Sequence, residues 1–240
     1  MSGGNRLELV SMILLVDAGN TRIKWTWLSD QGLTPMQAAV YEASAPWTQT
    51  MADSQHRPQR ILVANVRGPS FAAEFATFTQ SAFGVTPEYP EAQPTQLGVT
   101  NGYRQPASLG IDRWLALLAA RQENTGPCLL VGGGTALTID ALSANGLHLG
   151  GLIVPGLKML SDLQASQPSQ ALAALILQSL DVLQAREPTT APRLLLAGGD
   201  AQTLAPLLGR PVDLRQDLVL RGLSLLALSP LDPRAQTTAT

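Results

Sequence analysis

Two glycine-containing turns carry groups that could bind phosphate, and the first is VDAGNTRIKW, residues 16–25. Asp17 ends an apolar run and is followed by Gly19, Asn20 and Thr21. Glycine lets a backbone approach phosphate closely, and Asn20 and Thr21 supply hydrogen-bond donors. A carboxylate held at the end of a buried strand could bind Mg²⁺, which takes one or two carboxylates together with phosphate oxygens. A hairpin in which Asp17 only caps the turn is the alternative.

The second turn lies in VGGGTALTID, residues 131–140, where three glycines precede Thr135. A Walker P-loop needs a Gly-Lys-Ser/Thr sequence leading into a helix, whereas this turn leads into a predicted strand. A second backbone clamp on phosphate and a plain tight hairpin both fit it. A third glycine turn, LAGGD at 196–200, could let an adenine or ribose lie against the backbone at Gly198 and Gly199.

The stretch GIDRW, residues 110–114, places Asp112 and Arg113 side by side at a predicted helix start, with Ser108 as the expected N-cap. Arg113 could bind a carboxylate or phosphate. Asp112 could accept the proton of a substrate hydroxyl, as aspartates do in kinases. The alternative is a first-turn charge that favours the helix dipole beside a surface arginine.

The elements that must position these residues follow from the apolar pattern. Continuous apolar runs predict buried strands, and glycine and proline mark the turns between them. Residues 86–106 contain four prolines and are predicted to form a long loop. Strand–turn–strand segments are expected in 12–28 and 128–142. Single strands are expected in 60–66, 146–156 and 193–200, the last two ending in turns, and helices in 44–55, 69–83, 108–122, 171–186 and 217–228.

An internal repeat relates the two phosphate-type turns. Aligning Val16 with Val131 pairs Gly19 with Gly134 and Asn20 with Thr135. Both segments read as strand, turn, strand, so the simplest account is duplication, with chance as the alternative. We therefore expect two related α/β domains, 12–118 and 119–240, facing each other across a cleft, with residues 1–11 as an extension.

Composition limits the class of protein. The 240 residues are 45% hydrophobic and 14% charged, with a net charge of −2, so the chain can bury a core and has no basic surface for nucleic acid or membrane. The single cysteine, Cys128, excludes an intrachain disulfide and is expected to be a buried thiol. No apolar run reaches the roughly 20 residues that span a bilayer. His56 and His148 have no partner at catalytic spacing and are expected to be structural or surface residues.

Six segments occur in an order seen in a known family: DAGNTRIKW, NGYRQPASLGIDRW, GGGTALTID, GGLIVPG, LAGGDA and DLVLRGL. Through these segments, which extend from about Met12 to Gly222, the chain resembles the type III pantothenate kinases. These are related to the Bvg accessory factor proteins within the acetate and sugar kinase/Hsp70/actin superfamily. The resemblance implies an α/β fold of two duplicated ribonuclease H-like (actin-like ATPase) domains with mixed sheets flanked by helices.

The resemblance also implies a reaction: ATP-dependent phosphorylation of the terminal hydroxyl of pantothenate to 4′-phosphopantothenate, the first step of coenzyme A biosynthesis. It implies ATP, Mg²⁺ and a monovalent cation, K⁺ or NH₄⁺, in a cytoplasmic homodimer. Asp112 matches the family's general base, and Asp17 matches the carboxylate that lies toward Mg²⁺. The positions that match ATP and phosphate contacts are Asp17, Gly19, Asn20, Thr21, Lys24, Gly134, Thr135, Ala136, Gly198 and Gly199. Those that match the pantothenate pocket are Tyr103, Gly110, Ile111, Asp112 and Arg113.

The chain departs from the family pattern in two places. Gly132 stands where relatives usually carry an aspartate, which implies altered metal dependence or weak activity. The segment after Leu160 is short and has no threonine between Thr138 and Thr189, whereas family members place a pocket threonine there. Two alternatives therefore stay open: a catalytically weak or inactive nucleotide-binding accessory protein of the same fold, and a related kinase for another small hydroxyl substrate.

Overall fold

The structure is a computed structural model that describes residues 12–41 and 47–229. The expected extension, 1–11, lies outside the described residues. Between Pro90 and Glu91 the chain divides into two compact units. The domain boundary expected between Leu118 and Ala119 stays a prediction, and it falls inside helix α3 (Ile111–Glu123), whose main contacts are with elements of the second unit.

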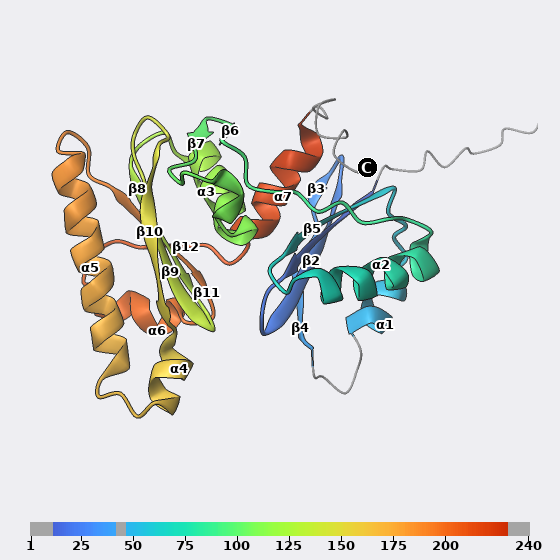
Figure 1. Ribbon diagram of the computed structural model, residues 1–240, viewed down its shortest axis with the longest axis horizontal. Helices are drawn as coiled ribbons and strands as arrows, with labels where there is room; N and C mark the ends of the chain where they lie inside the picture. The colour runs from blue at the N-terminus through green and yellow to red at the C-terminus, as the bar shows by residue number, and fades with distance from the viewer. Residues whose placement is uncertain (1–11, 42–46, 230–240) are drawn as a thin grey trace, which may run out of the picture. The chain divides into compact units, whose positions relative to one another are not determined.

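The sheet of the first unit is built around the predicted hairpin (Figure 1). β1 (Ile13–Ala18) pairs antiparallel with β2 (Arg22–Ser29) and parallel with β5 (Arg60–Asn65). β3 (Gly32–Leu33) and β4 (Gln37–Val40) both pair with β2. β1 is buried along almost its whole length, which is why its sequence is a continuous apolar run rather than an alternating one.

Two helices complete the first unit, α1 (Trp47–Ala52) and α2 (Pro69–Phe83). Proline is suited to the first turn of α2 because the amide hydrogen it lacks would have no partner there. After the helix, Gly84 takes a left-handed conformation, φ 69°, and its N–H donates to the Gln80 carbonyl. The aromatic rings of α1 and α2 stack on one another and pack against the sheet, which gives this unit its own core.

The second unit contains a mixed sheet in the order β10-β9-β8-β11-β12. Its hairpin is β8 (Cys128–Gly133) with β9 (Ala136–Leu142), and β10 (His148–Pro155) adds an antiparallel edge. β11 (Arg193–Gly198) runs parallel to β8 and to β12 (Asp213–Leu214). Cys128 is 1% exposed, so the expectation of a buried thiol is confirmed.

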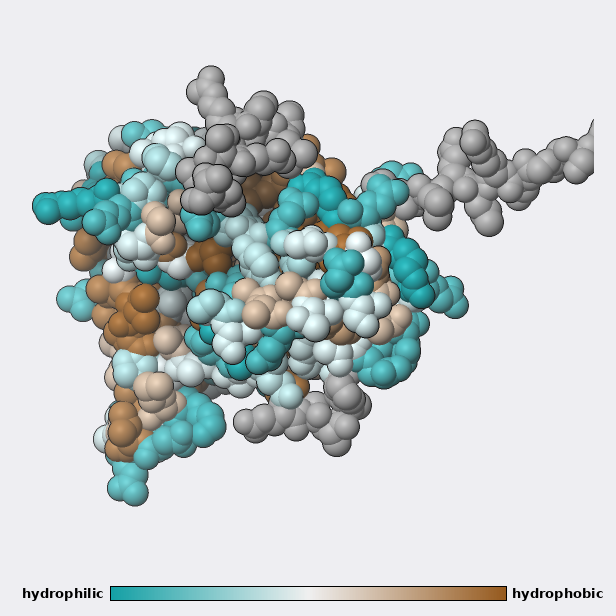
Figure 2. Space-filling model, turned by 45° about the vertical axis from the view of Figure 1, so that its right-hand side comes forward, coloured by the Kyte–Doolittle hydropathy of each residue, from teal (hydrophilic) through white to brown (hydrophobic). Residues whose placement is uncertain are grey.

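Helices cover both faces of this second sheet. Helix α5 (Pro168–Arg186) lies on one face, and α3 lies on the other together with α7 (Leu218–Leu228) (Figure 1). Gly222 of α7 permits their close approach, because a Cβ there would lie 2.3 Å from the Leu115 carbonyl oxygen. Short helices α4 (Leu157–Asp162) and α6 (Ala201–Leu204) follow β10 and β11. On the face drawn in Figure 2, apolar patches alternate with polar ones.

The two hairpins share one topology. Val16 of β1 pairs with Trp25 and Val63, and Val131 of β8 pairs with Ile139 and Leu196. In each unit the first strand thus lies between an antiparallel partner and a parallel one. This agreement supports the duplication read from the sequence, and the predicted fold class of mixed sheets flanked by helices is confirmed.

Two local expectations need correction. Ser108 is not the N-cap of α3: it ends a 3₁₀ turn, Pro106–Ser108, and Gly110 takes the cap position. The predicted loop at 86–106 contains a small hairpin of β6 (Thr95–Gln96) and β7 (Val99–Thr100), which the prolines around it obscured. Among the described residues, no helix is both long and apolar enough to cross a bilayer.

Candidate functional site

The first phosphate-type turn joins β1 to β2. Asp17 is 7% exposed and lies opposite Lys24 on β2, with 3.6 Å between Oδ2 and Nζ. The N–H of Gly19 donates to the Arg22 carbonyl at 3.1 Å and closes the turn, while Asn20 and Thr21 are exposed at its tip. The hairpin therefore brings together the carboxylate, the lysine and the polar tip residues that the sequence singled out.

In the second unit, the GGGT turn after β8 and the LAGGD turn after β11 lie together, with Gly156, which follows β10, beside them. The Gly156 N–H donates to the Thr135 carbonyl at 3.1 Å, and Gly134 N–H to the Ala136 carbonyl at 3.1 Å. Gly198 has φ 87°, and a Cβ there would lie 2.0 Å from the Gly133 carbonyl oxygen. Only glycine fits this crossing, so the conformation of the LAGGD turn is set by its contact with the GGGT turn.

Gly132 faces a hydroxyl on the next strand. It pairs with Thr138 across β8 and β9, and a Cβ at position 132 would lie 2.7 Å from Thr138 Oγ1. Glycine at position 132 therefore leaves room for the Thr138 hydroxyl.

Asp112 lies in the first turn of α3, beside the Gly110 cap. A Cβ on Gly110 would lie 2.7 Å from Asp112 Oδ1, so the glycine leaves room for the carboxylate. Burial raises the pKa of Asp112 above its ordinary value, although hydrogen bonding and charge from Arg113 partly oppose this. A carboxylate with a raised pKa is a better proton acceptor at neutral pH than an ordinary one.

Arg113 points into the unit rather than toward solvent and forms a buried ion pair. Its Nε donates to Asp140 Oδ2 at 2.8 Å and its Nη2 to Oδ1 at 2.6 Å. Burial alone would raise the pKa of Asp140, but hydrogen bonds from His148 and Arg113 outweigh it and lower that pKa below its ordinary value. Both members of the pair are therefore charged at neutral pH.

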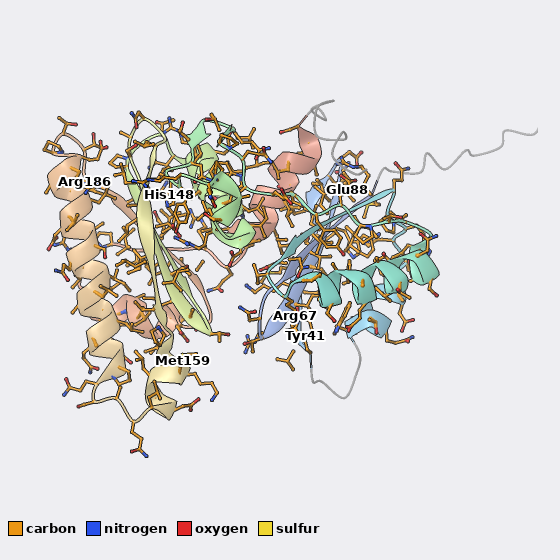
Figure 3. The ribbon with its side chains drawn as sticks, viewed as in Figure 1. Tyr41, Arg67, Glu88, His148, Met159 and Arg186 are labelled. Carbon is orange, nitrogen blue, oxygen red and sulfur yellow. The ribbon has the colours of Figure 1, made fainter. Side chains whose placement is uncertain are left out.

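The ion pair extends to Tyr103 and His148 (Figure 3 labels the histidine). Arg113 Nη1 donates to the Tyr103 hydroxyl at 3.1 Å, and His148 Nε2 lies 2.8 Å from Asp140 Oδ1. The Tyr103 and His148 rings stack at 5.7 Å with 14° between their planes. Since the ionised carboxylate only accepts, His148 carries its proton on Nε2, and its buried Nδ1 has no hydrogen-bond partner among the described residues.

Sequence reasoning missed Asp140, the contacts of His148 with Asp140 and Tyr103, and the role of Gly151. His148 is structural, as one of its two expected roles had it, and at 1% exposed it is not a surface residue. A Cβ on Gly151 would lie 2.5 Å from Asp140 Oδ1 and 2.6 Å from Arg113 Nη2, so only glycine leaves room for the pair. A signal existed: a carboxylate within the apolar strand ALTIDAL needs a buried partner.

A groove of about 550 Å³ between β10 and α5 is not lined by the side chains of Tyr103, Arg113, Asp140 or His148. Ile139 and Ala141 line it, and side chains alternate along a strand, so Asp140 lies on the opposite face of the sheet. None of the sequence-predicted site residues lines the groove.

The carboxylates of the candidate site offer few ligands to a metal ion. Within the described ranges, no group of three or more His, Cys, Asp or Glu side chains is placed to hold a metal ion. The single carboxylate of Asp17 fits an ion that takes most of its ligands from phosphate oxygens and water, as Mg²⁺ does. Position 132 adds no carboxylate to the second turn.

Comparisons with known proteins agree on one family. The sequence model described as type III pantothenate kinase matches residues 13–172. The chain is 36% identical to the type III pantothenate kinase of Nitrosococcus oceani, covering 94% of this chain and 97% of that protein. It is 34% identical to that of Aromatoleum aromaticum, covering 90% and 98%.

A solved structure shares the fold. It is a Campylobacter jejuni protein described as a conserved Baf family transcriptional activator, and it matches with a TM-score of 0.53 and 22% identity over 89% of this chain and 96% of that one. At this identity the match supports the fold alone. The near-complete match to the curated relatives goes further: the chain belongs to the type III pantothenate kinase family.

Proposed function

We infer that this protein transfers a phosphoryl group from ATP to the terminal hydroxyl of pantothenate. The observation that carries the inference is the match along nearly the whole chain to relatives named type III pantothenate kinases. The arrangement of Asp17 and Asp112 supports it, since both carboxylates occupy the ends of rigid elements. None of the contacts described above favours a non-catalytic accessory protein.

The geometry within each unit supports the proposed roles. Asp112, with its raised pKa, accepts the proton of the attacking hydroxyl. Tyr103 and Arg113 form the wall of the acceptor pocket together with Gly110 and Ile111. Because Arg113 already donates to Asp140 and Tyr103, its role is to hold that wall and the start of α3, more than to neutralise the substrate.

The two glycine turns and the LAGGD turn are proposed to contact ATP. Their backbone N–H groups and small residues suit close approach of phosphate and ribose. Mg²⁺, held through Asp17, would supply positive charge to the phosphates. The proposed contacts are Asp17, Gly19, Asn20, Thr21, Lys24, Gly134, Thr135, Ala136, Gly198 and Gly199.

Family membership also supports proposals on the monovalent cation and on assembly. We propose K⁺ or NH₄⁺ as an activator, with one carboxylate fewer than usual because position 132 is glycine. We also propose a cytoplasmic homodimer, by resemblance to the family.

The test is a direct assay. Purified protein with ATP, Mg²⁺, K⁺ and pantothenate should yield 4′-phosphopantothenate, identified by mass spectrometry. Reactions lacking pantothenate, or with other small hydroxyl compounds in its place, are the controls. Bound ATP without turnover under any cation would contradict the kinase proposal, and turnover of a different hydroxyl compound alone would change its substrate.

A further inference from the structure

Two side chains from distant segments donate hydrogen bonds to backbone carbonyls of the first phosphate-type turn. The Tyr41 hydroxyl donates to the Gly19 carbonyl at 3.0 Å, and Arg67 Nη1 donates to the Asn20 carbonyl at 2.7 Å. These acceptors are consecutive carbonyls of the turn, whereas the donors lie 22 and 47 residues away in sequence. Figure 3 labels both donor side chains.

Tyr41 and Arg67 also hold each other. The Arg67 guanidinium carbon lies 3.8 Å from the centre of the Tyr41 ring, and that ring meets Phe71 edge-on at 5.9 Å. The Arg67 N–H donates to Asn65 Oδ1 at 2.9 Å, which fixes the loop after β5. Burial raises the pKa of Tyr41 to about 12, so its hydroxyl keeps the proton that it donates. The turn is thus held by a charged donor, Arg67, and a neutral donor, Tyr41, which stack on each other.

The two hydrogen bonds from Tyr41 and Arg67 set the direction in which the N–H groups of the turn point. The described chain has no cis peptide bond, and in a trans peptide the carbonyl and the following N–H point in opposite directions. With the Gly19 carbonyl held toward Tyr41 and the Asn20 carbonyl toward Arg67, the N–H groups of Asn20 and Thr21 point away from both side chains. Successive N–H groups on one side form an anion-binding concavity.

We propose that Arg67 and Tyr41 are positioning residues for ATP, which fix the two peptide planes between residues 19 and 21 so that the N–H groups of Asn20 and Thr21 face the phosphates. This rests on the proposed function for the identity of the anion. Neither residue belongs to the motifs singled out in the sequence, and Arg67 is exposed, so its two contacts are not a consequence of burial in the core.

The second turn supports the same logic with different donors. Thr135 aligns with Asn20 in the internal repeat, and its carbonyl is held by the Gly156 N–H at 3.1 Å. Both turns therefore have the equivalent carbonyl tied back. In the second turn a backbone amide does this, and in the first turn Arg67 does it.

The experiment compares ATP with adenosine by calorimetry, without pantothenate. Arg67→Ala should raise the Kd for ATP about tenfold, as expected for loss of a charge-assisted hydrogen bond. Tyr41→Phe, which keeps the ring under Arg67, should raise it about threefold. The Kd for adenosine should not change in either variant, because adenosine has no phosphates. In the kinase assay, KM for ATP should rise while KM for pantothenate stays constant.

Arg57→Ala is the matched control. Arg57 is likewise exposed in the first unit and donates to backbone carbonyls, but those belong to Ser54 and His56. This variant should bind ATP as the wild type does. Arg67→Lys keeps the charge without the planar stack and should resemble Arg67→Ala.

Three outcomes would overturn the proposal: an unchanged Kd for ATP in Arg67→Ala, equal weakening of ATP and adenosine, or full affinity in Arg67→Lys. Failure of the kinase proposal is separable, because a wild type that binds ATP but does not phosphorylate pantothenate still permits the comparison. A wild type that binds no ATP overturns both.

Discussion

Arg113 and Asp140 form a two-point ion pair whose side chains are only 7% and 4% exposed, although 27 residues separate them in sequence. The pair links the first turn of α3 to β9, which lies between β10 and β8 in the second sheet. Because Asp112 is the neighbour of Arg113, the same contact fixes where the proposed base lies. A buried pair of this kind contributes less to net stability than to the position of what it joins.

Asp140→Asn should nevertheless be strongly destabilising. It leaves the Arg113 charge buried without a counter-ion, and loss of one partner of a buried pair costs about 3–5 kcal/mol of unfolding free energy. Urea denaturation measures the change. Asp213→Asn is the control, because its pair with Arg193 is 39% and 32% exposed and should contribute less than about 1 kcal/mol. Equal, small effects in both variants would refute the buried-pair argument.

Asp112→Asn should abolish phosphoryl transfer but leave ATP binding in place. In the wild type, kcat/KM should fall toward acid pH as Asp112 protonates, at a pH above that of an ordinary aspartate, since burial raises its pKa. The free energy of unfolding changes with pH in the opposite direction to activity. A raised folded-state pKa favours the protonated form of Asp112, so stability is lost as pH rises through that pKa. At neutral pH, Asp112→Asn should thus have an equal or higher Tm. An active asparagine variant would rule out Asp112 as the base.

Gly132→Asp should place a carboxylate at the second turn only if Thr138 makes room. A Cβ at position 132 would lie 2.7 Å from Thr138 Oγ1, so the single variant is strained until the threonine rotates. Gly132→Asp combined with Thr138→Ala should lower the K⁺ or Mg²⁺ concentration that gives half-maximal activity, with Thr138→Ala alone as control. Identical cation dependence in the wild type, Thr138→Ala and the double variant would show that a carboxylate at position 132 has no part in cation binding.

Two substitutions of His148 separate its two contacts. His148→Phe keeps a ring against Tyr103 but loses the bond to Asp140, so it should cost about 1 kcal/mol of stability with little change in KM for pantothenate. His148→Gln keeps a donor but loses the stacked ring, so KM for pantothenate should rise severalfold. Denaturation and steady-state kinetics report the two effects. If the glutamine variant kept the wild-type KM, stacking on Tyr103 would not shape the acceptor pocket.

The sequence by itself determined the local features. Apolar runs and glycine turns depend on neighbouring residues, so the two hairpins, most helices and the placement of Asp17, Gly19 and Asp112 could be predicted. The repeat between Val16 and Val131 also predicted a topology that both sheets share. The error at Ser108 arose because the 3₁₀ turn competes with a helix start at the same proline-containing sequence.

Only the tertiary structure decided which polar side chains meet. Alternation along β9 separates its two faces but does not name the partner of Asp140, which comes from α3, or the stacked pair of His148 and Tyr103. Arg67 likewise reaches the Asn20 carbonyl across 47 residues, with no spacing in the sequence to indicate it. Such contacts depend on how strands and helices pack, because hydrogen bonds and ion pairs form between groups that are close in space, whatever their separation along the chain.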